Sequence, residues 1–345
     1  MPCEPAASPQ PHQPPAEILE GLRAMGLLPP GAVAEGEPLA GGVSSDIWRV
    51  ALPGRGPVCV KRALPKLKVA ADWRAPTARS LYEARWMRRA AAAAPGSVPA
   101  LLGQDEGTGA LALEWLPPED HALWKERLRD GHADPDFAAE VARRLARVHA
   151  ATAADPAVAG EFPTDAIFHA IRLEPYLLAT ARAHPDLAAP LERLVAVTAE
   201  TKRALVHGDV SPKNILAGPR GPVFLDAECA WWGDPAFDLA FCLNHLLLKC
   251  LWTPRAGAGF LACFDALADA YLAGVDWEPP AALEGRAARL LPGLFLARVD
   301  GKSPVEYLTE DADKDRVRRT ARALLVEPVE RLAAVRDAWG EELER

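Results

Sequence analysis

The pattern of apolar and polar positions divides this chain into a strand-rich first third and a longer helical remainder. Residues 47–50 alternate in polarity, and residues 58–61 form a short β-prone run after Pro57, so both segments are predicted strands. Between them, the Pro-Gly-Arg-Gly of residues 53–56 has the composition of a hairpin turn. A helix over 16–25, a helix over 77–94 and a strand over 110–114 complete this third.

From residue 137 onward the periodicity is helical. One face of the first such helix is marked by apolar positions spaced four and three apart, Val141, Leu145 and Val148, with His149 beside them. The rhythm breaks over residues 204–226, where two short apolar runs flank a polar loop, and then returns. The apolar stretch 237–252 is interrupted by Asp238, Asn244, His245 and Lys249, which predicts a buried core helix rather than a membrane span.

Composition narrows the classes of function. The formal net charge of −8 disfavours a nucleic-acid partner, which needs a basic face. The six cysteines include no C-x-x-C pair, so we expect reduced, buried thiols in a cytoplasmic protein, with one disulfide as an alternative. The N-terminus lacks a basic region followed by an apolar core. We therefore expect neither a membrane partner nor a secretory signal.

The chemistry concentrates in residues 206–216, Val-His-Gly-Asp-Val-Ser-Pro-Lys-Asn-Ile-Leu, and in residues 223–228, Val-Phe-Leu-Asp-Ala-Glu. Phosphoryl transfer needs a carboxylate that orients the attacking hydroxyl, together with hard oxygen ligands for Mg²⁺. Asp209 and Asn214 lie five residues apart on a loop, and Asp226 follows a short apolar strand. This spacing matches the catalytic-loop pattern of protein kinases, with Gly208 in place of arginine.

The alternative is that Asp209 and Asn214 only cap turns, which both residue types often do. The downstream apolar run ending in Asp226 favours the catalytic interpretation. We expect His207 to brace the loop through hydrogen bonds rather than to act as a base.

These strings resemble the aminoglycoside phosphotransferase superfamily, which includes choline, homoserine and 5-methylthioribose kinases. The resemblance implies an α+β, bilobal protein-kinase-like fold with ATP and Mg²⁺ as cofactors. It implies that Asp209 is the catalytic base and that Asn214, Asp226 and Glu228 bind metal. It extends to the Asp-Pro-Ala-Phe-Asp-Leu-Ala of residues 234–240, where Asp238 is expected to hold the catalytic loop without reacting.

The resemblance also places a nucleotide site in the first third. Lys61 corresponds to the lysine that contacts the α- and β-phosphates, and Glu83 to the helix carboxylate that pairs with it. Their alternatives are a solvated strand lysine and an exposed helix charge. The loop 39–46 fits a phosphate-covering turn, and the connector fits an adenine site; the corresponding candidates are Gly41, Gly42, Ser44, Ser45, Glu114 and Leu116.

From these motifs we expect a disordered proline-rich tail over 1–15, a nucleotide-binding lobe over 16–116, and a catalytic and substrate-binding lobe over 117–345. Residues 61–65, Lys-Arg-Ala-Leu-Pro, and the Asp-x-Glu that starts at Asp226 resemble the 5-methylthioribose kinase branch. The Val-Ser-Pro-Lys-Asn of residues 210–214 departs from that branch and leaves the acceptor open.

The best substrate hypothesis is a small metabolite with an acceptor hydroxyl, such as a sugar of the 5-methylthioribose type. An aminoglycoside-type antibiotic kinase and a nucleotide-binding pseudokinase scaffold are the alternatives, and the resemblance allows a homodimer. Aromatic faces suit a sugar or thioether, and arginine suits an anionic or polyol group. The substrate-side candidates are Trp73, Trp231, Trp232 and Arg298, where each tryptophan could equally be core and Arg298 could pair with Asp300 or another acid.

Overall fold

Two units, each with its own core, make up the chain in the computed structural model, which describes residues 13–39, 45–64 and 77–345. Unit 1 holds the described residues up to Ala84 together with Pro99–Leu116, and unit 2 holds Arg85–Val98 and Pro117–Arg345. The division after Leu116 falls where the sequence places a lobe boundary. Residues 85–98 differ from that expectation, because they group with the second unit.

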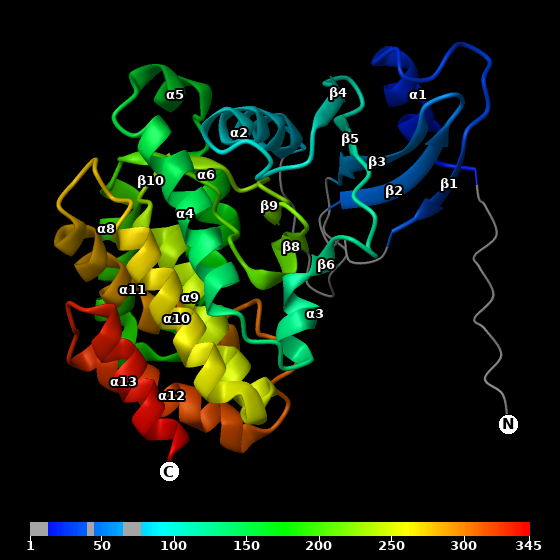
Figure 1. Cartoon of the computed structure of the whole chain (residues 1–345). Helices are drawn as coiled ribbons and strands as arrows, with labels where there is room; N and C mark the ends of the chain where they lie inside the picture. Colours follow the sequence, from blue (N-terminus) through cyan, green and yellow to red (C-terminus); the bar gives the residue numbers. More distant parts are fainter. Residues whose placement is uncertain (1–12, 40–44, 65–76) are drawn as a thin grey trace, which may run out of the picture. The chain divides into compact units, whose positions relative to one another are not determined.

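Unit 1 is an antiparallel sheet covered by one helix (Figure 1). The strand order is β1-β2-β3-β5-β4. The strands are β1 (Glu35–Pro38), β2 (Ser45–Leu52), β3 (Gly56–Ala63), β4 (Leu101–Asp105) and β5 (Ala110–Glu114), and α1 spans Ala16–Ala24. The helix over 16–25 and the strands at 47–50, 58–61 and 110–114 are therefore confirmed. β4 was not predicted.

The core of unit 1 follows from the alternation along β3. Val58 and Val60 are buried and pack in one cluster with Leu19 and Leu22 of α1. Because successive side chains of a strand point to opposite faces, Lys61 belongs to the face that does not carry this cluster. The turn that joins β2 to β3 contains Gly54 at φ +73°, and β3 begins with Gly56 at φ +90°, a region that favours glycine.

Unit 2 is mainly helical. Its longer helices are α4 (Pro135–Thr152), α8 (Ala188–Glu200), α9 (Ala236–Trp252), α10 (Gly257–Leu272), α11 (Pro280–Asp300), α12 (Asp311–Val326) and α13 (Leu332–Leu343). Its shorter helices are α3 (Trp124–Arg129), α5 (Pro156–Glu161), α6 (Asp165–Phe168) and α7 (Ala179–Ala183), and α2 (Arg79–Ala93) belongs to it from Arg85 onward. Helix α4 starts at Asp134, whose side chain accepts a hydrogen bond from the backbone N–H of Phe137, as an N-cap should.

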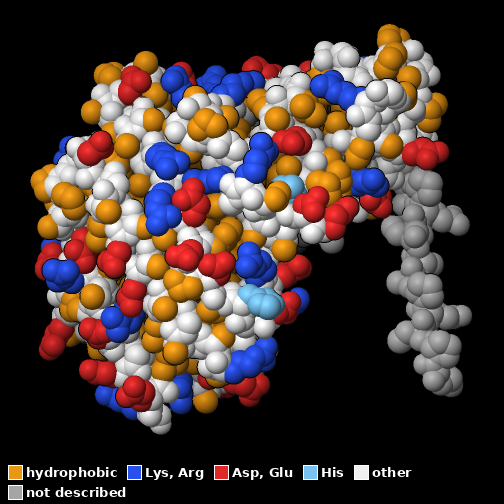
Figure 2. All heavy atoms as spheres, viewed as in Figure 1, with side chains coloured by type: hydrophobic (Ala, Val, Ile, Leu, Met, Phe, Trp, Pro, Cys, Tyr) orange, Lys and Arg blue, Asp and Glu red, His pale blue; other side chains and the backbone are white. Residues whose placement is uncertain are grey.

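Helix α9 lies at the centre of unit 2, packed on α10 and α11 (Figure 1). Every residue from Ala236 to Leu251 is buried, which confirms the predicted core helix. Among the described residues, no helix is long and apolar enough to cross a membrane. On the face drawn in Figure 2, lysine and arginine side chains of unit 2 lie interspersed with acidic ones.

Five short strands form two small sheets in unit 2. β7 (Ala204–Val206) pairs with β10 (Trp231–Gly233), and β8 (Ile215–Gly218) pairs with both β6 (Ala122–Leu123) and β9 (Gly221–Phe224). β7 lies before the catalytic-loop motif and β8 lies after it, so hydrogen-bonded strands hold both ends of the loop. The break in helical rhythm over 204–226 is thereby explained.

Five cysteines lie among the described residues, and all are free thiols, with four of them buried: Cys229, Cys242, Cys250 and Cys263. Burial raises the pKa of Cys59 to about 11 and that of Cys250 to about 12. These thiols are protonated at neutral pH and behave as small apolar side chains.

Candidate active site

The candidate catalytic loop begins where β7 ends. Gly208 sits at φ +80°, and a Cβ atom there would lie 2.7 Å from the carbonyl oxygen of Cys229. Only glycine fits both the backbone conformation and the close approach. The arginine of the protein-kinase pattern is therefore excluded here by the backbone itself.

Asp238, near the start of α9, holds this loop. Its Oδ2 accepts from the backbone N–H of His207 at 2.7 Å, and its Oδ1 accepts from the backbone N–H of Gly208 at 2.8 Å. The same carboxylate contacts Nε2 of His149 at 3.2 Å. Asp238 is fully buried, and its oxygens are used on the loop backbone, which confirms the predicted structural role.

His207 also braces the loop, as the sequence predicts. Its Nδ1 accepts from the backbone N–H of Asp209 at 3.1 Å, and its Nε2 lies 3.1 Å from the carbonyl oxygen of Leu225. Trp86 packs edge-on against the ring at 4.7 Å between centroids. Burial lowers the pKa of His207, so the neutral ring links the Asp209 segment to the Asp226 segment.

Asp209 is buried, and its carboxylate forms ion pairs with two positively charged side chains. Nη2 of Arg172 lies 3.0 Å from its Oδ2, and Nζ of the exposed Lys213 lies 3.2 Å from the same oxygen. The negative charge of Asp209 raises the pKa of Lys213. For Arg172, burial acts to lower the pKa, but the charge of Asp209 together with Cys229, Tyr176 and Glu228 outweighs burial and raises it. Both cations are thus tied to this carboxylate.

Arg172 is a site residue that sequence reasoning missed. It lies in a π-helix, η1 (His169–Leu178), which contains Pro175. Its guanidinium donates to the carbonyl oxygen of Gly208 as well as to Asp209. Proline lacks the N–H that a regular α-helix needs at that position, and widened π turns recur at functional sites. The Glu-Pro-Tyr at 174–176 was an available signal for this irregular turn.

Asn214 and Asp226 are brought together by the backbone. Asn214 donates its Nδ2–H to the carbonyl oxygen of Asp209 at 3.1 Å, and its own carbonyl oxygen accepts from the N–H of Leu225 at 2.9 Å. Asp226 adopts φ +66°, a left-handed conformation that costs about 1–3 kcal/mol for a residue other than glycine. Such strain is often kept where a side chain must be aimed.

These residues fit a magnesium ion. The Asn214 amide donates from its nitrogen, so its Oδ1 is turned away from that bond, and it accepts no hydrogen bond within the described part of the chain. An amide oxygen plus the carboxylates of Asp226 and Glu228 make the hard-oxygen set that Mg²⁺ prefers. Over residues 13–39, 45–64 and 77–345, no group of three or more His, Cys, Asp or Glu side chains forms a metal cluster.

In unit 1, Lys61 and Glu83 form a buried ion pair. Nζ of Lys61 lies 2.9 Å from the Glu83 carboxylate, and the two side chains are 8% and 2% exposed. The predicted pairing is confirmed. The carboxylate gives the buried ammonium a fixed extended position on β3.

The other predicted nucleotide residues are placed in part. Ser45 is buried at the start of β2. Glu114 ends β5, where its carboxylate accepts from the backbone N–H of Ala100 at 3.2 Å, and Leu116 closes unit 1. Gly41, Gly42, Ser44 and Trp73 lie outside the described residues.

The tryptophans of β10 differ from each other. Trp231 is 1% exposed, stacks on Phe168 at 4.1 Å and donates its indole N–H to Asp165 at 2.6 Å. Its contacts favour a core role. Trp232 points to the other side of the strand and is half-buried.

Arg298 has no carboxylate partner among the described residues. Asp300 instead contacts Arg318 at 2.7 Å and His184 at 2.8 Å, so the alternative of an Arg298–Asp300 pair is wrong. Nη1 of Arg298 lies 3.2 Å from the hydroxyl of Tyr176.

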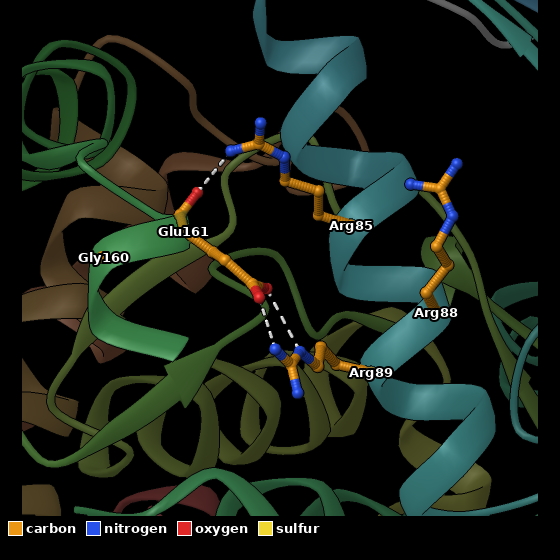
Figure 3. Close-up of a pocket in the computed structure, with 5 residues that line it drawn as sticks. All are labelled: Arg85, Arg88, Arg89, Gly160 and Glu161. Atoms are coloured by element: carbon orange, nitrogen blue, oxygen red, sulfur yellow. Dashed lines mark hydrogen bonds and ion pairs between the residues drawn. The ribbon is translucent and has the colours of Figure 1, made fainter. Parts of the chain in front are cut away.

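A surface hollow of about 580 Å³ lies between α2 and α5. Figure 3 shows Arg85 and Arg89 directed at Glu161, with Arg88 pointing away. Arg85 donates to the Glu161 backbone oxygen at 2.7 Å and Arg89 to its carboxylate at 3.1 Å. None of the predicted site residues lines it, and its charges are used in packing α2 on α5.

Comparison with known proteins agrees with this geometry. A model described as "Phosphotransferase enzyme family" matches residues 35–283. Methylthioribose kinase 1 of Oryza sativa subsp. japonica is 22% identical over 58% of this chain and 53% of its own length. The chain thus spans about half the length of the curated relatives it matches.

Solved structures are similar in fold. A choline/ethanolamine kinase family protein from Mesorhizobium loti gives a TM-score of 0.51 at 17% identity, covering 94% of this chain and 97% of its own. An amicoumacin kinase in complex with AMP-PNP and Ca²⁺ gives 0.50 at 13% identity, covering 88% and 91%. At these identities the likeness shows a protein-kinase-like fold and no more.

Proposed function

This chain belongs to the phosphotransferase enzyme family, and on that premise we propose that it transfers the γ-phosphoryl group of Mg·ATP to a hydroxyl of a small metabolite, with Asp209 as catalytic base. Small-molecule phosphotransfer is the activity of this family. The observation that carries the proposal is the arrangement around Asp209. Asp238 and His207 hold the backbone of the loop that carries this buried carboxylate, and Asn214 donates from its Nδ2 to the carbonyl oxygen of Asp209.

The chemical step is an in-line displacement. The acceptor oxygen forms a bond to the γ-phosphorus, the bond from that phosphorus to the β–γ bridging oxygen breaks, and ADP leaves. Asp209 orients the acceptor hydroxyl and takes its proton late, because a carboxylate is too weak a base to ionise an alcohol beforehand. Arg172 fixes the Asp209 carboxylate from one side and so sets the direction of the remaining lone pairs.

Several residues are proposed to bind the nucleotide and its metal. Lys61, steadied by Glu83, is proposed to bind the α- and β-phosphates. Asn214, Asp226 and Glu228 would hold Mg²⁺, which supplies charge neutralisation on the phosphates when bound. Gly41, Gly42, Ser44 and Ser45 are proposed to contact the phosphates. Glu114 and Leu116 are proposed to contact the adenine base.

The acceptor is proposed to be a sugar-like metabolite. Support comes from the likeness to methylthioribose kinases and from Trp232, a half-buried aromatic side chain in the middle of β10. Complete retention of Lys61, Glu83, Asp209, Asn214 and Asp226 argues against a pseudokinase scaffold. The interleaved charges of α12, such as Asp311 with Lys314, give no acidic surface of the kind a polycationic aminoglycoside requires.

The first test is ADP release with Mg·ATP against 5-methylthioribose, pentoses, hexoses, amino alcohols and aminoglycosides. Asp209→Ala should lower turnover about 10²–10⁴-fold while nucleotide binding is kept. Asp337→Ala, which removes an exposed carboxylate from α13, should leave turnover unchanged. Full activity in Asp209→Ala would remove this residue from the mechanism.

The metal assignment has its own test. Asp226→Ala should abolish the Mg²⁺ dependence of nucleotide binding, measured by titration calorimetry with and without the metal. A normal metal dependence in that variant would mean that the metal site lies elsewhere.

A further inference from the structure

A cluster of cationic and polar side chains lies in the interior of unit 2, beyond the catalytic loop. We call it the α9–α11 cluster. α9 contributes His245 and Lys249, α11 contributes Arg298, and the segment after α11 contributes Tyr307. Helices α9 and α11 pack side by side (Figure 1), which brings these residues to one place.

Lys249 is 1% exposed and has no hydrogen bond or ion pair within the described chain. Its Nζ lies 3.7 Å from the ring centre of Tyr307 and 3.9 Å from that of Trp252, and those rings stack on each other. Lysine is almost never fully buried without a carboxylate. Aromatic faces offset only part of the cost of removing an ammonium from water.

Three more polar atoms of the cluster are buried without a partner among the described residues. They are Nε of Arg298, Nε2 of His245 and the hydroxyl oxygen of Tyr307. Arg298 and His245 are 9% and 6% exposed. Each of the three can donate a hydrogen bond, and a buried donor left unpaired costs about 1–3 kcal/mol.

Acidic residues do not neutralise the cluster. Glu306 is the carboxylate beside Tyr307, but it pairs with Lys125 and its side chain is 66% exposed. Asp300, two residues from Arg298, is bound by Arg318 and His184. Nη1 of Arg298 donates to Ser303 and to the Tyr176 hydroxyl. The cluster is therefore a concentration of hydrogen-bond donors that has no carboxylate of its own among the described residues, and Nε of Arg298 stays without an acceptor there.

The cluster is continuous with the catalytic residues through Tyr176. The guanidinium of Arg298 lies 5.6 Å from the ring centre of Tyr176, and that of Arg172 lies 5.8 Å from the same centre. Arg172 in turn contacts Asp209 at 3.0 Å. His245 of α9 joins the same series of contacts. Its ring centroid lies 5.4 Å from that of Phe241, and the ring centroid of Phe241 lies 5.5 Å from that of Tyr176.

We propose that the acceptor metabolite carries an anionic group at the end away from the phosphorylated hydroxyl, and that Arg298, Lys249, His245 and Tyr307 bind it. This rests on the proposed function, because the hydroxyl must reach Asp209. The shared chemistry is a compact oxyanion, either a carboxylate or a phosphate ester. Its oxygens would supply the acceptors that Arg298 Nε–H, Lys249 and Tyr307 lack, and Arg is suited to such groups.

The activity test compares neutral D-ribose with two anionic relatives as acceptors, D-ribonate, which carries a carboxylate, and D-ribose 5-phosphate, which carries a phosphate ester. Wild-type protein is expected to prefer one of the two anions over ribose by at least about tenfold in kcat/KM, the effect of one charge-assisted contact. Arg298→Gln and Lys249→Met should remove that preference mainly through KM. Arg289→Gln is the matched control, because Arg289 lies on the same helix but pairs with Glu330 at the surface.

Binding supplies a second readout that does not need turnover. Sodium sulfate should raise the melting temperature of wild-type protein more than sodium chloride at equal ionic strength. The excess should vanish in Arg298→Gln and Lys249→Met and persist in Arg289→Gln. Arg298→Lys, which keeps the charge, should retain part of it and guards against a folding defect in the glutamine variant.

The outcomes separate this inference from the proposed function. Equal use of ribose and both anions by wild type and Arg298→Gln, with no sulfate effect, would overturn the anion site and leave phosphoryl transfer intact. Absence of turnover with every acceptor, while sulfate stabilisation still depends on Arg298 and Lys249, would support the anion site and count against the proposed reaction.

Discussion

Lys61 in unit 1 and Lys249 in unit 2 are both buried lysines, yet their surroundings are opposite. Lys61 has the Glu83 carboxylate 2.9 Å away. Lys249 has two aromatic rings and other cations around it, and burial together with the charge of Lys125 lowers its pKa to about 6. A folded chain normally supplies the counter-charge for a buried cation itself. Where it does not, a ligand is the natural source of that charge, and the following experiments test this contrast.

The largest change in stability is expected from breaking the ion pair of Lys61 and Glu83. Glu83→Gln leaves the Lys61 ammonium buried beside a neutral amide, so the free energy of unfolding should fall by about 3–5 kcal/mol. Urea denaturation measures it. The double variant Lys61→Met with Glu83→Leu should regain much of the loss, since no charge remains buried; a single variant as stable as wild type would show that the pair is not desolvated.

Replacing the unpaired Lys249 should change the free energy of unfolding in the opposite direction. Lys249→Met removes a buried amine that has no counter-charge, so in the absence of ligand the free energy of unfolding should rise by about 1–4 kcal/mol. Loss of stability at neutral pH would mean that the Trp252 and Tyr307 contacts are the dominant favourable interaction of Lys249.

The same pair of proteins gives a pH test. The folded-state pKa of Lys249, about 6, lies below the ordinary lysine value of 10.5, so between these values the unfolded chain binds more protons. Wild-type stability relative to Lys249→Met should therefore rise with pH from about 6 to 10, by at most about 1.4 kcal/mol per unit. The charged groups facing the amine are Lys125 from α3, Arg298 from α11 and Glu306. A flat difference across this range would contradict the lowered pKa.

The smallest effect is expected where the ion pair of Arg172 and Asp209 is kept but its geometry changes. Arg172→Lys retains a positive charge beside Asp209 but loses the second contact to Gly208, so kcat should fall about tenfold with little change in nucleotide binding. Added guanidinium should partly restore activity to Arg172→Ala. Failure of guanidinium to act, together with a fall in stability, would assign Arg172 a purely structural role.

Much of the catalytic loop could be predicted because its constraints are local. Asp209 and Asn214 share one short loop, and Gly208 has to be glycine for the positive φ and the contact with Cys229. The strand at 110–114 was predicted to the residue, since a short apolar run and the Pro117-Pro118 pair after it act over a few positions. The bracing by Asp238 was expected from the resemblance to the aminoglycoside phosphotransferase superfamily.

Other features depended on contacts between distant segments. Arg172 reaches Asp209 only because a π-helix with Pro175 turns it inward, and no periodicity in the sequence marks that direction. The placement of residues 85–98 in unit 2 comes from packing of Trp86 on His207, across more than a hundred residues.

The sequence by itself indicated the family and singled out the candidate catalytic carboxylate and the candidate magnesium ligands, because phosphoryl transfer needs those residue types at short spacing. Tertiary structure alone decided which charges are paired. Asp300 sits two residues from Arg298 yet binds Arg318 and His184, while Lys249 and Arg298 meet across two helices without an acid. The physical reason is that the cost of a buried charge depends on what lies within a few ångströms in space, which neighbouring positions in a chain do not specify.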